Sequence, residues 1–186
     1  MRVFLLASFP SLSLQEPAPL TLEQFLTRCD AHLPESEMEE LERVCAMPPD
    51  GKSDFAKEWT QAWWEVRNFN DRARVKRLPA GTVEESPADL PYRFDRLRAQ
   101  STAAWDSANP LERERILLLA KWTWLEERRR AAPYSQADLL AYAIQLRLLE
   151  IRDAWDEEKG AGQFEEQTKT FMSPLLDQLF PKEIPA

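Results

Sequence analysis

Apolar residues recur at helical spacing through most of the chain, and the first two predicted helices are short. Residues 22–33 place their apolar side chains on one helix face. Thr21 and Gln24 form a capping-box pattern at the start of this segment. After Pro34 the pattern predicts a second helix over 35–46, and its outer face carries the acidic residues Glu35, Glu37, Glu39, Glu40 and Glu42.

The longest predicted helix covers residues 54–78 and changes character along its length. Its second half is basic, and Pro79 and Gly81 end it. A fourth helix fits residues 91–106. The apolar residues of the longest helix alternate between intervals of four and three, which gives a heptad-like seam suited to packing along another helix; they are Phe55, Trp59, Ala62, Val66, Phe69 and Ala73.

Two more long helices are predicted over 110–131 and 134–159. Asn109 followed by Pro110 is a helix-start signal, because asparagine caps the first turn and proline fits its first position. The apolar run 116–120 predicts burial on most sides of the first of these helices. The second carries an apolar stripe formed by Leu140, Ile144, Leu148, Ile151 and Trp155.

These segments predict an all-α fold, a single-domain helical bundle over residues 1–186 with a short extended or β segment at its N-terminus. The chain has only 4 Gly, which disfavours a turn-rich β-sandwich or barrel. Residues 1–9 resemble a weak signal peptide, but the apolar run is short and Pro10 interrupts it. We therefore expect this segment to be a structural part that is not cleaved. Short helices are expected near the C-terminus, over 163–172 and from Ser173.

The charge balance restricts the functions that fit this chain. Lys and Arg number 24 against 32 Asp and Glu, a net charge of −8, which is a poor match to nucleic acid or an anionic membrane. No segment approaches the ~18 apolar residues that span a bilayer, so we expect no membrane insertion. With two cysteines, Cys29 and Cys45, and the single His32, no zinc site or His-based catalysis is indicated. We expect no catalytic residue, no metal ligand and no cofactor, and hence no enzyme.

Tryptophans and a basic segment are the two features that point to binding. Trp63 and Trp64 cannot both face one core, nor can Trp122 and Trp124, because neighbouring positions differ by about 100° around a helix. One of each pair is expected at a second helix layer or at a partner surface. The basic segment 67–77 is either a solvated face with internal ion pairs or a surface for an acidic partner. The candidate partner-binding residues are Arg72, Arg74, Arg77, Trp64 and Trp124.

Helical spacing divides the arginines of the basic segment. Arg67, Arg74 and Arg77 lie along one line beside the apolar seam, so at least one of them is expected to be partly buried and paired. Arg72 is displaced from that line by about 160°. This position makes Arg72 the better candidate for a partner contact.

Four segments, in the same order along the chain, carry a family resemblance. The opening Val3-Phe4-Leu5-Leu6-Ala7-Ser8-Phe9-Pro10-Ser11-Leu12 resembles the "YLVASLP-L" start of a small bacterial family encoded with V-type ATP synthase genes. Trp64-Glu65-Val66-Arg67-Asn68-Phe69 through Arg74 resembles its "W-E-x-x-R-N…R-x-R" segment. Residues 109–115 and 139–146 are similar to its "NPLE-E" and "L-AYA-KLQ" segments.

The resemblance implies a mechanical function. The family is similar to a reduced form of the C-type subunit of V/A-type ATPases, known as the d-type subunit in eukaryotes, although this chain is much shorter than a full protein of that type. Such a subunit lies between the central stalk and the membrane rotor ring and passes torque between them. The implied partners are the other subunits of the ATPase, and the implied location is cytoplasmic, peripheral at the inner membrane through the complex. A helical assembly or regulatory adaptor outside the mature rotor is the alternative.

Overall fold

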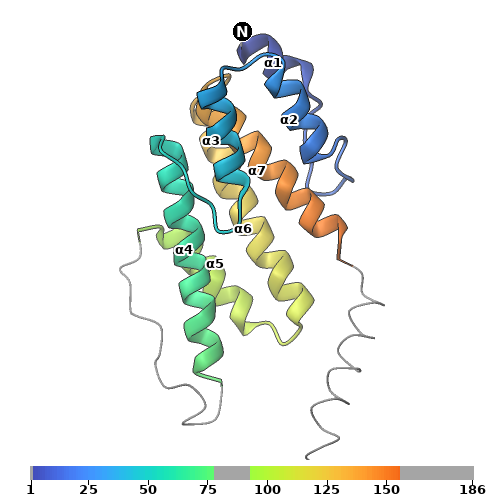
Figure 1. The fold of residues 1–186 in the computed structure, drawn as a ribbon. Coiled ribbons are helices and arrows are strands. Elements are labelled where there is room, and N and C mark those ends of the chain that lie inside the picture. Colours follow the sequence, from blue (N-terminus) through green and yellow to red (C-terminus); the bar gives the residue numbers. More distant parts are fainter. Residues whose placement is uncertain (1, 78–92, 156–186) are drawn as a thin grey trace, which may run out of the picture. The chain divides into compact units, whose positions relative to one another are not determined.

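The computed structural model describes residues 2–77 and 93–155, in which helices are the only regular secondary structure (Figure 1). Residues Met1–Glu150 form one compact unit, and Ile151–Ala186 fall into a second. The described residues confirm the all-α bundle, whereas the extent of one domain over 1–186 stays a prediction. The helices are α1 (Arg2–Ser8), α2 (Leu22–Asp30), α3 (Glu35–Cys45), α4 (Asp54–Val75), α5 (Asp95–Asp106), α6 (Pro110–Ala131) and α7 (Gln136–Asp153).

The start of α2 shows the predicted capping box. The Thr21 hydroxyl accepts a hydrogen bond from the Gln24 backbone N–H at 3.1 Å, and the Gln24 side chain accepts one from the Thr21 N–H at 3.0 Å. The helix ends at Asp30, earlier than the predicted residue 33. The reason is that Leu33 precedes Pro34, and a residue before proline avoids the helical conformation.

The predicted start of α6 is also confirmed. The Asn109 side-chain oxygen accepts a hydrogen bond from the Leu111 N–H at 2.9 Å, and Pro110 occupies the first turn. The short helices expected over 163–172 and from Ser173 lie outside the described residues.

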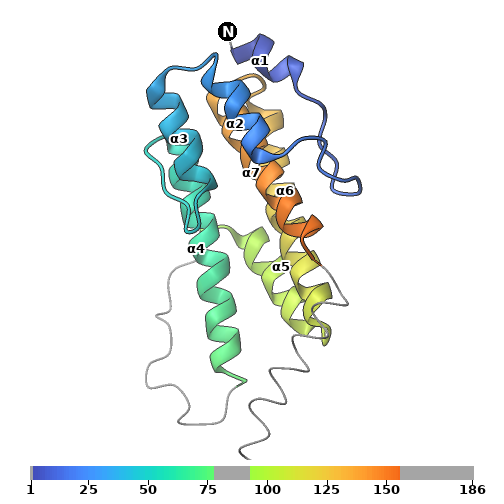
Figure 2. The same ribbon diagram turned by 45° about the vertical axis from the view of Figure 1, so that its right-hand side comes forward.

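Between Asp138 and Leu149, helix α7 is buried on nearly all sides rather than along one stripe. The predicted stripe residues Leu140, Ile144 and Leu148 are buried, whereas Ile151 and Trp155 are only half-buried. Helix α2 lies against one side of α7, where the Leu22 N–H donates to the Glu150 carboxylate at 2.7 Å, and α6 runs beside the other (Figures 1 and 2). Because a helix with neighbours on both sides has little solvent-facing surface, the positions between the stripe residues are buried too: Leu139, Ala141, Ala143, Leu146 and Leu149.

Helices α4, α5 and α6 pack side by side (Figure 2). The predicted seam of α4 is buried from Phe55 to Val66. At its centre, the Trp59 ring lies 5.8 Å from the Trp124 ring of α6. Beyond Val66, none of the α4 residues is fully buried. The apolar first half of α4 therefore belongs to the core, and its basic second half does not.

The N-terminal segment is a helix, which corrects the expected extended or β conformation. Residues 2–8 form α1, with Leu5 and Leu6 buried, and the Arg2 guanidinium binds the Glu37 carboxylate at 2.6 and 2.8 Å. The stretch 9–20 contains no helix. A strand needs a neighbouring strand to pair its backbone N–H and C=O groups, and the described residues offer none, whereas a helix pairs these groups within itself.

Candidate functional site

Buried carboxylates are the first place to look for acid–base chemistry, and here they hold the starts of helices. The Glu40 carboxylate accepts hydrogen bonds from the backbone N–H of Lys52 at 2.9 Å and of Ser53 at 2.7 Å, just before α4. The Glu65 carboxylate accepts two backbone N–H groups at 2.9 and 3.2 Å, just before α5. Each carboxylate comes from another helix and lies at the positive end of the dipole of the helix whose start it binds, where a negative charge is favourable.

Glu40 corrects one sequence-based expectation. The pattern places it on the acidic outer face of α3, but the structure leaves only 6% of it exposed, since its carboxylate turns inward onto the loop before α4. Burial by itself raises the pKa of Glu40, but hydrogen bonds from the backbone of Ser53 and Lys52 reverse this effect, and the pKa is lowered overall. Glu40 is therefore an ionised acceptor and a poor candidate for a proton donor.

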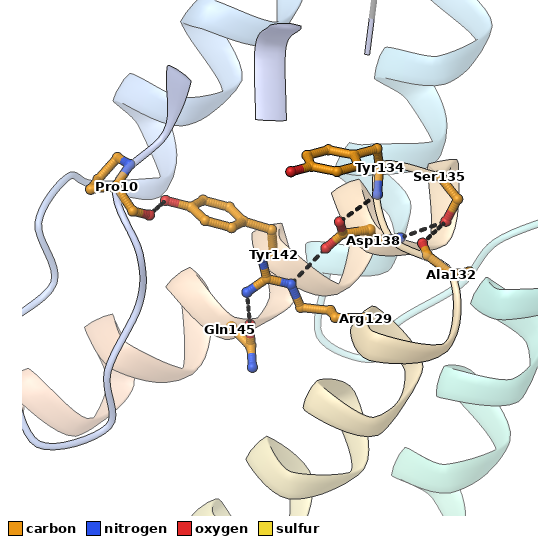
Figure 3. Close-up of polar contacts among 8 residues, drawn as sticks. All are labelled: Pro10, Arg129, Ala132, Tyr134, Ser135, Asp138, Tyr142 and Gln145. Atoms are coloured by element: carbon orange, nitrogen blue, oxygen red, sulfur yellow. Dashed lines mark hydrogen bonds and ion pairs between the residues drawn. The ribbon is translucent and has the colours of Figure 1, made fainter. Parts of the chain in front are cut away.

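A second buried cluster surrounds Arg129, at the turn between α6 and α7 (Figure 3). The Arg129 guanidinium donates to the Asp138 carboxylate at 2.7 Å and to the Gln145 side-chain oxygen at 2.7 Å. The other Asp138 oxygen accepts the Tyr134 backbone N–H at 2.8 Å, and Tyr134 has a left-handed backbone with φ 59°. The guanidinium also lies 5.1 Å from the centre of the Tyr142 ring.

Tyr142 connects this cluster to the N-terminal segment. Its hydroxyl donates a hydrogen bond to the Pro10 carbonyl at 2.8 Å, across most of the length of the chain. The Tyr142 ring stacks with Phe9 at 5.4 Å and with Phe25 at 5.3 Å. Burial raises the pKa of Tyr142 to about 12, only partly opposed by the charge of Arg129, so the hydroxyl stays a donor at neutral pH. The contacts of this cluster hold the N-terminal segment against α7.

A groove of about 440 Å³ opens beside the Arg129 cluster, between the N-terminal segment and the α6–α7 turn. Its cations are already paired: Arg129 with Asp138, and Arg130 with Glu126 at 3.2 Å. The groove therefore carries no excess charge from these arginines, whose partners belong to the fold itself.

The basic half of α4 presents a different kind of surface. We call Trp64, Arg67, Asp71 and Arg74 the α4 arginine surface. The two arginines share the Asp71 carboxylate, each through one nitrogen at 3.7 Å. Trp64 is 44% exposed and packs edge-on against Trp63 with 4.9 Å between ring centres, and the Arg67 guanidinium lies 5.7 Å from the Trp64 ring. This surface brings together the predicted site residues Trp64 and Arg74.

The other predicted site residues lie elsewhere. Trp124 is only 6% exposed, packed against Trp59 and Phe55, which corrects its expected place at a partner surface. Trp122 is buried as well, because α6 has neighbours on both sides. Arg72 is half-buried and Arg67 is exposed, whereas the sequence led us to expect the reverse. The reason is that the buried part of the apolar seam ends at Val66, so the line of α4 that carries Arg67 is no longer covered.

Arg77 belongs to a cluster that the sequence did not indicate. Its guanidinium donates to the Trp105 carbonyl at 2.6 Å and lies 4.8 Å from the Trp105 ring. The Arg113 guanidinium lies 3.9 Å from the same ring, and the indole N–H donates to Asn70 at 2.7 Å. This cluster joins the ends of α4 and α5 to the start of α6. Residues so far apart in sequence share no spacing from which the contact could be inferred.

Other chemistry is scarce in the described residues. No group of three or more His, Cys, Asp and Glu side chains is placed to hold a metal ion there. Cys29 and Cys45 are free and buried, and burial raises the pKa of each thiol to about 12, which makes them unreactive. Among residues 2–77 and 93–155, no helix combines the length and apolar character needed to cross a bilayer.

Comparison with family models, curated proteins and solved structures found no match to this chain.

Proposed function

We propose that this chain is a non-catalytic subunit of a bacterial V/A-type ATPase, which couples the central stalk to the membrane rotor ring. In this proposal the protein is cytoplasmic and is held at the inner membrane only through the complex. Its partners are the other ATPase subunits, and it carries out no reaction of its own.

One observation carries the proposal: two of the segments that resemble the family meet in the fold. Phe9 and Pro10 come from the opening segment, and Tyr142 comes from the "L-AYA-KLQ" segment. The Tyr142 hydroxyl binds the Pro10 carbonyl at 2.8 Å (Figure 3). The Tyr142 ring also stacks on Phe9. Residues that a family keeps because its fold needs them are expected to meet in this way, and this contact is the observation on which the proposal rests.

The segment from Trp64 to Arg74 supports a binding function. Within this segment, Glu65 accepts hydrogen bonds at the start of α5 and Val66 is buried in the core, so both have a structural function. Trp64, Arg67 and Arg74 are instead exposed on the α4 arginine surface. Residues of these types are favoured at the centres of protein–protein interfaces.

The test is purification of the V/A-type ATPase from the source of this protein, followed by mass spectrometry of the intact complex and of its dissociated parts. We expect this chain in the intact complex and in the part that holds the central stalk. Its presence only in assembly intermediates would favour the adaptor alternative. Its absence from every form would contradict the proposal.

A further inference from the structure

The α4 arginine surface has an excess of positive charge in an otherwise acidic protein. Residues 51–80 contain 7 basic and 4 acidic side chains, whereas the whole chain has a net charge of −8. Three of the four acidic groups are engaged elsewhere: Asp54 with Lys57, Glu58 with Arg128, and Glu65 at the start of α5. Of these four, Asp71 is the one that remains to balance the arginines of this surface.

Asp71 engages only a small part of the two guanidinium groups. Arg67 uses its Nε, and Arg74 uses one Nη, each 3.7 Å from a different Asp71 oxygen. A guanidinium has five N–H donors, so this carboxylate leaves most donors of both arginines to other acceptors. The two side chains are 54% and 64% exposed, and pairs of this kind are individually weak. The surface can therefore accept further carboxylates at little cost.

The aromatic part of the surface holds Arg67 in place. Its guanidinium lies 5.2 Å from the centre of the Trp63 ring and 5.7 Å from that of Trp64. Cation–π contacts and the Asp71 pair limit the positions that the Arg67 side chain adopts, which lowers the entropy lost on binding. Trp64 adds an exposed apolar face beside the two cations.

We propose that the α4 arginine surface binds an acidic segment of a partner protein. Carboxylates of that segment pair with Arg67 and Arg74, and an adjacent apolar side chain covers Trp64. Asp71 is the internal carboxylate with which the partner competes. The identity of the partner as an ATPase subunit rests on the proposed function, whereas its acidic chemistry follows from the charge complementarity of this surface.

The test uses the full chain and a synthetic helix-forming peptide of about 20 residues, in which turns rich in Glu alternate with turns rich in Leu. Binding is measured by fluorescence anisotropy of the labelled peptide between roughly 50 and 300 mM NaCl, because salt screens exposed charge pairs. The double variant Arg67→Ala/Arg74→Ala is expected to bind about tenfold more weakly or worse. Asp71→Asn is expected to bind about threefold more tightly, since it removes the competing carboxylate.

Lys57→Ala is the matched control, because Lys57 is also an exposed cation of α4 that pairs with a nearby carboxylate, Asp54. Its binding is expected to stay within about twofold of the wild type. Thermal melting of every variant checks the fold. If the double variant fails to fold, Asp71→Asn still decides the question, because tighter binding supports the proposal and weaker or unchanged binding contradicts it.

Three other outcomes would overturn the assignment. Equal peptide binding by the double variant and the wild type would show that the arginines do not form the site. Tighter binding of duplex DNA or phosphatidylglycerol vesicles than of the peptide, with the same loss in the double variant, would make the ligand a polyanion of another class. A salt-sensitive dimer in sedimentation that the double variant lacks would make the occupant a second copy of this chain.

The ATPase purification separates this inference from the proposed function. If the wild-type chain is absent from the complex but peptide binding depends on Arg67 and Arg74, the proposed function fails and the acidic-segment site stands. If the double variant assembles as well as the wild type and binds the peptide equally, the site fails and the proposed function stands.

Discussion

A glutamate that is far from a helix in sequence can accept hydrogen bonds at the start of that helix, as an N-cap residue does. Glu40 holds the start of α4, Glu65 the start of α5, and Glu150 the start of α2. In each case a carboxylate accepts backbone N–H groups at the first residue of the helix or just before it, which have no partner within the helix. Part of the acidic composition of the chain is therefore needed for folding, and these carboxylates are poor candidates for catalysis.

The first prediction concerns Glu40 and pH. Its pKa is lowered in the folded state, below the ordinary value of about 4.3 for an unfolded chain. The stabilisation is therefore complete above that unfolded value and is lost as the pH falls through the folded pKa. We expect Glu40→Gln to cost about 1–3 kcal/mol at pH 7, and the difference from the wild type to narrow below about pH 4.

Thermal melting of both proteins between about pH 3 and 7 checks this prediction. Glu39→Gln is the control, because Glu39 is the exposed neighbour of Glu40 on the same helix. A constant difference between Glu40→Gln and the wild type across this pH range would contradict the assigned role of the Glu40 charge.

The second prediction concerns Gly51, which lies in the loop that Glu40 holds. A Cβ atom added at Gly51 would lie 2.3 Å from the Ala56 Cβ and 3.0 Å from a Glu40 carboxylate oxygen. We expect Gly51→Ala to lower the free energy of unfolding by about 1–3 kcal/mol through overpacking. Urea unfolding of Gly51→Ala, Ala56→Gly and the double variant measures the coupling. Strictly additive effects would show that the two positions do not clash.

At the scale of elements, the cores of α4 and α7 yield the third prediction. Trp59 is 1% exposed and Ile144 is 2% exposed, in helices that different neighbours cover. Replacing either with Ala leaves a cavity and is expected to cost about 2–5 kcal/mol. Thermal and urea unfolding test both variants, with Leu119→Ala as a control because Leu119 is 49% exposed on α6. An unchanged melting temperature for Trp59→Ala or Ile144→Ala would contradict its place in the core.

Helical periodicity and capping signals predicted helices α2 to α7, but they predicted neither α1 nor how each helix is covered. Thr21 and Asn109 mark helix starts because their partners are two or three residues away. The burial of Glu40 depends on the loop before α4, and the burial of α7 on nearly all sides depends on which helices flank it. Such contacts join residues without a fixed spacing, so a sequence pattern does not contain them.

The same limit applies to the candidate site. The basic and aromatic composition of residues 64–77 indicated a binding surface, and the structure exposes Trp64 and Arg74 together on one face of α4. The apolar seam placed Trp59 in the core, but the spacing did not reveal that Trp124 packs against it, because one of Trp122 and Trp124 was expected at a second helix layer or a partner surface. Nor did the spacing show at which residue the neighbouring helices stop covering α4. That point determines which arginines are exposed.

At the scale of the whole molecule, the fold has a firmly packed part and a part whose side chains are exposed. Phe9 and Tyr142 tie the N-terminal segment to α7, and Trp59 and Trp124 tie α4 to α6. The basic half of α4 contributes little to either cluster and lies at the other end of the Met1–Glu150 unit from α1 (Figure 1). The proposed coupling function requires this combination of a firmly packed body and a surface whose residues can bind a partner.

The last prediction compares charge reversal at Arg67 and Arg72. The sequence suggests that Arg67→Glu loses stability first, but Arg67 is exposed and pairs with Asp71 on its own helix. We therefore expect Arg67→Glu to cost less than about 1 kcal/mol, mainly from repulsion by Asp71 one turn away, and to lose assembly with the ATPase. Arg72 is half-buried, so Arg72→Glu is expected to lower the melting temperature more, because a carboxylate there is partly removed from water.

Melting and assembly are measured for both variants at physiological salt. The partner contact expected at Arg72 stays a prediction, and loss of assembly by Arg72→Glu with an unchanged melting temperature would support it. Normal assembly of Arg67→Glu would show that the α4 arginine surface is not the contact, because this variant keeps the fold and reverses the charge at the centre of that surface.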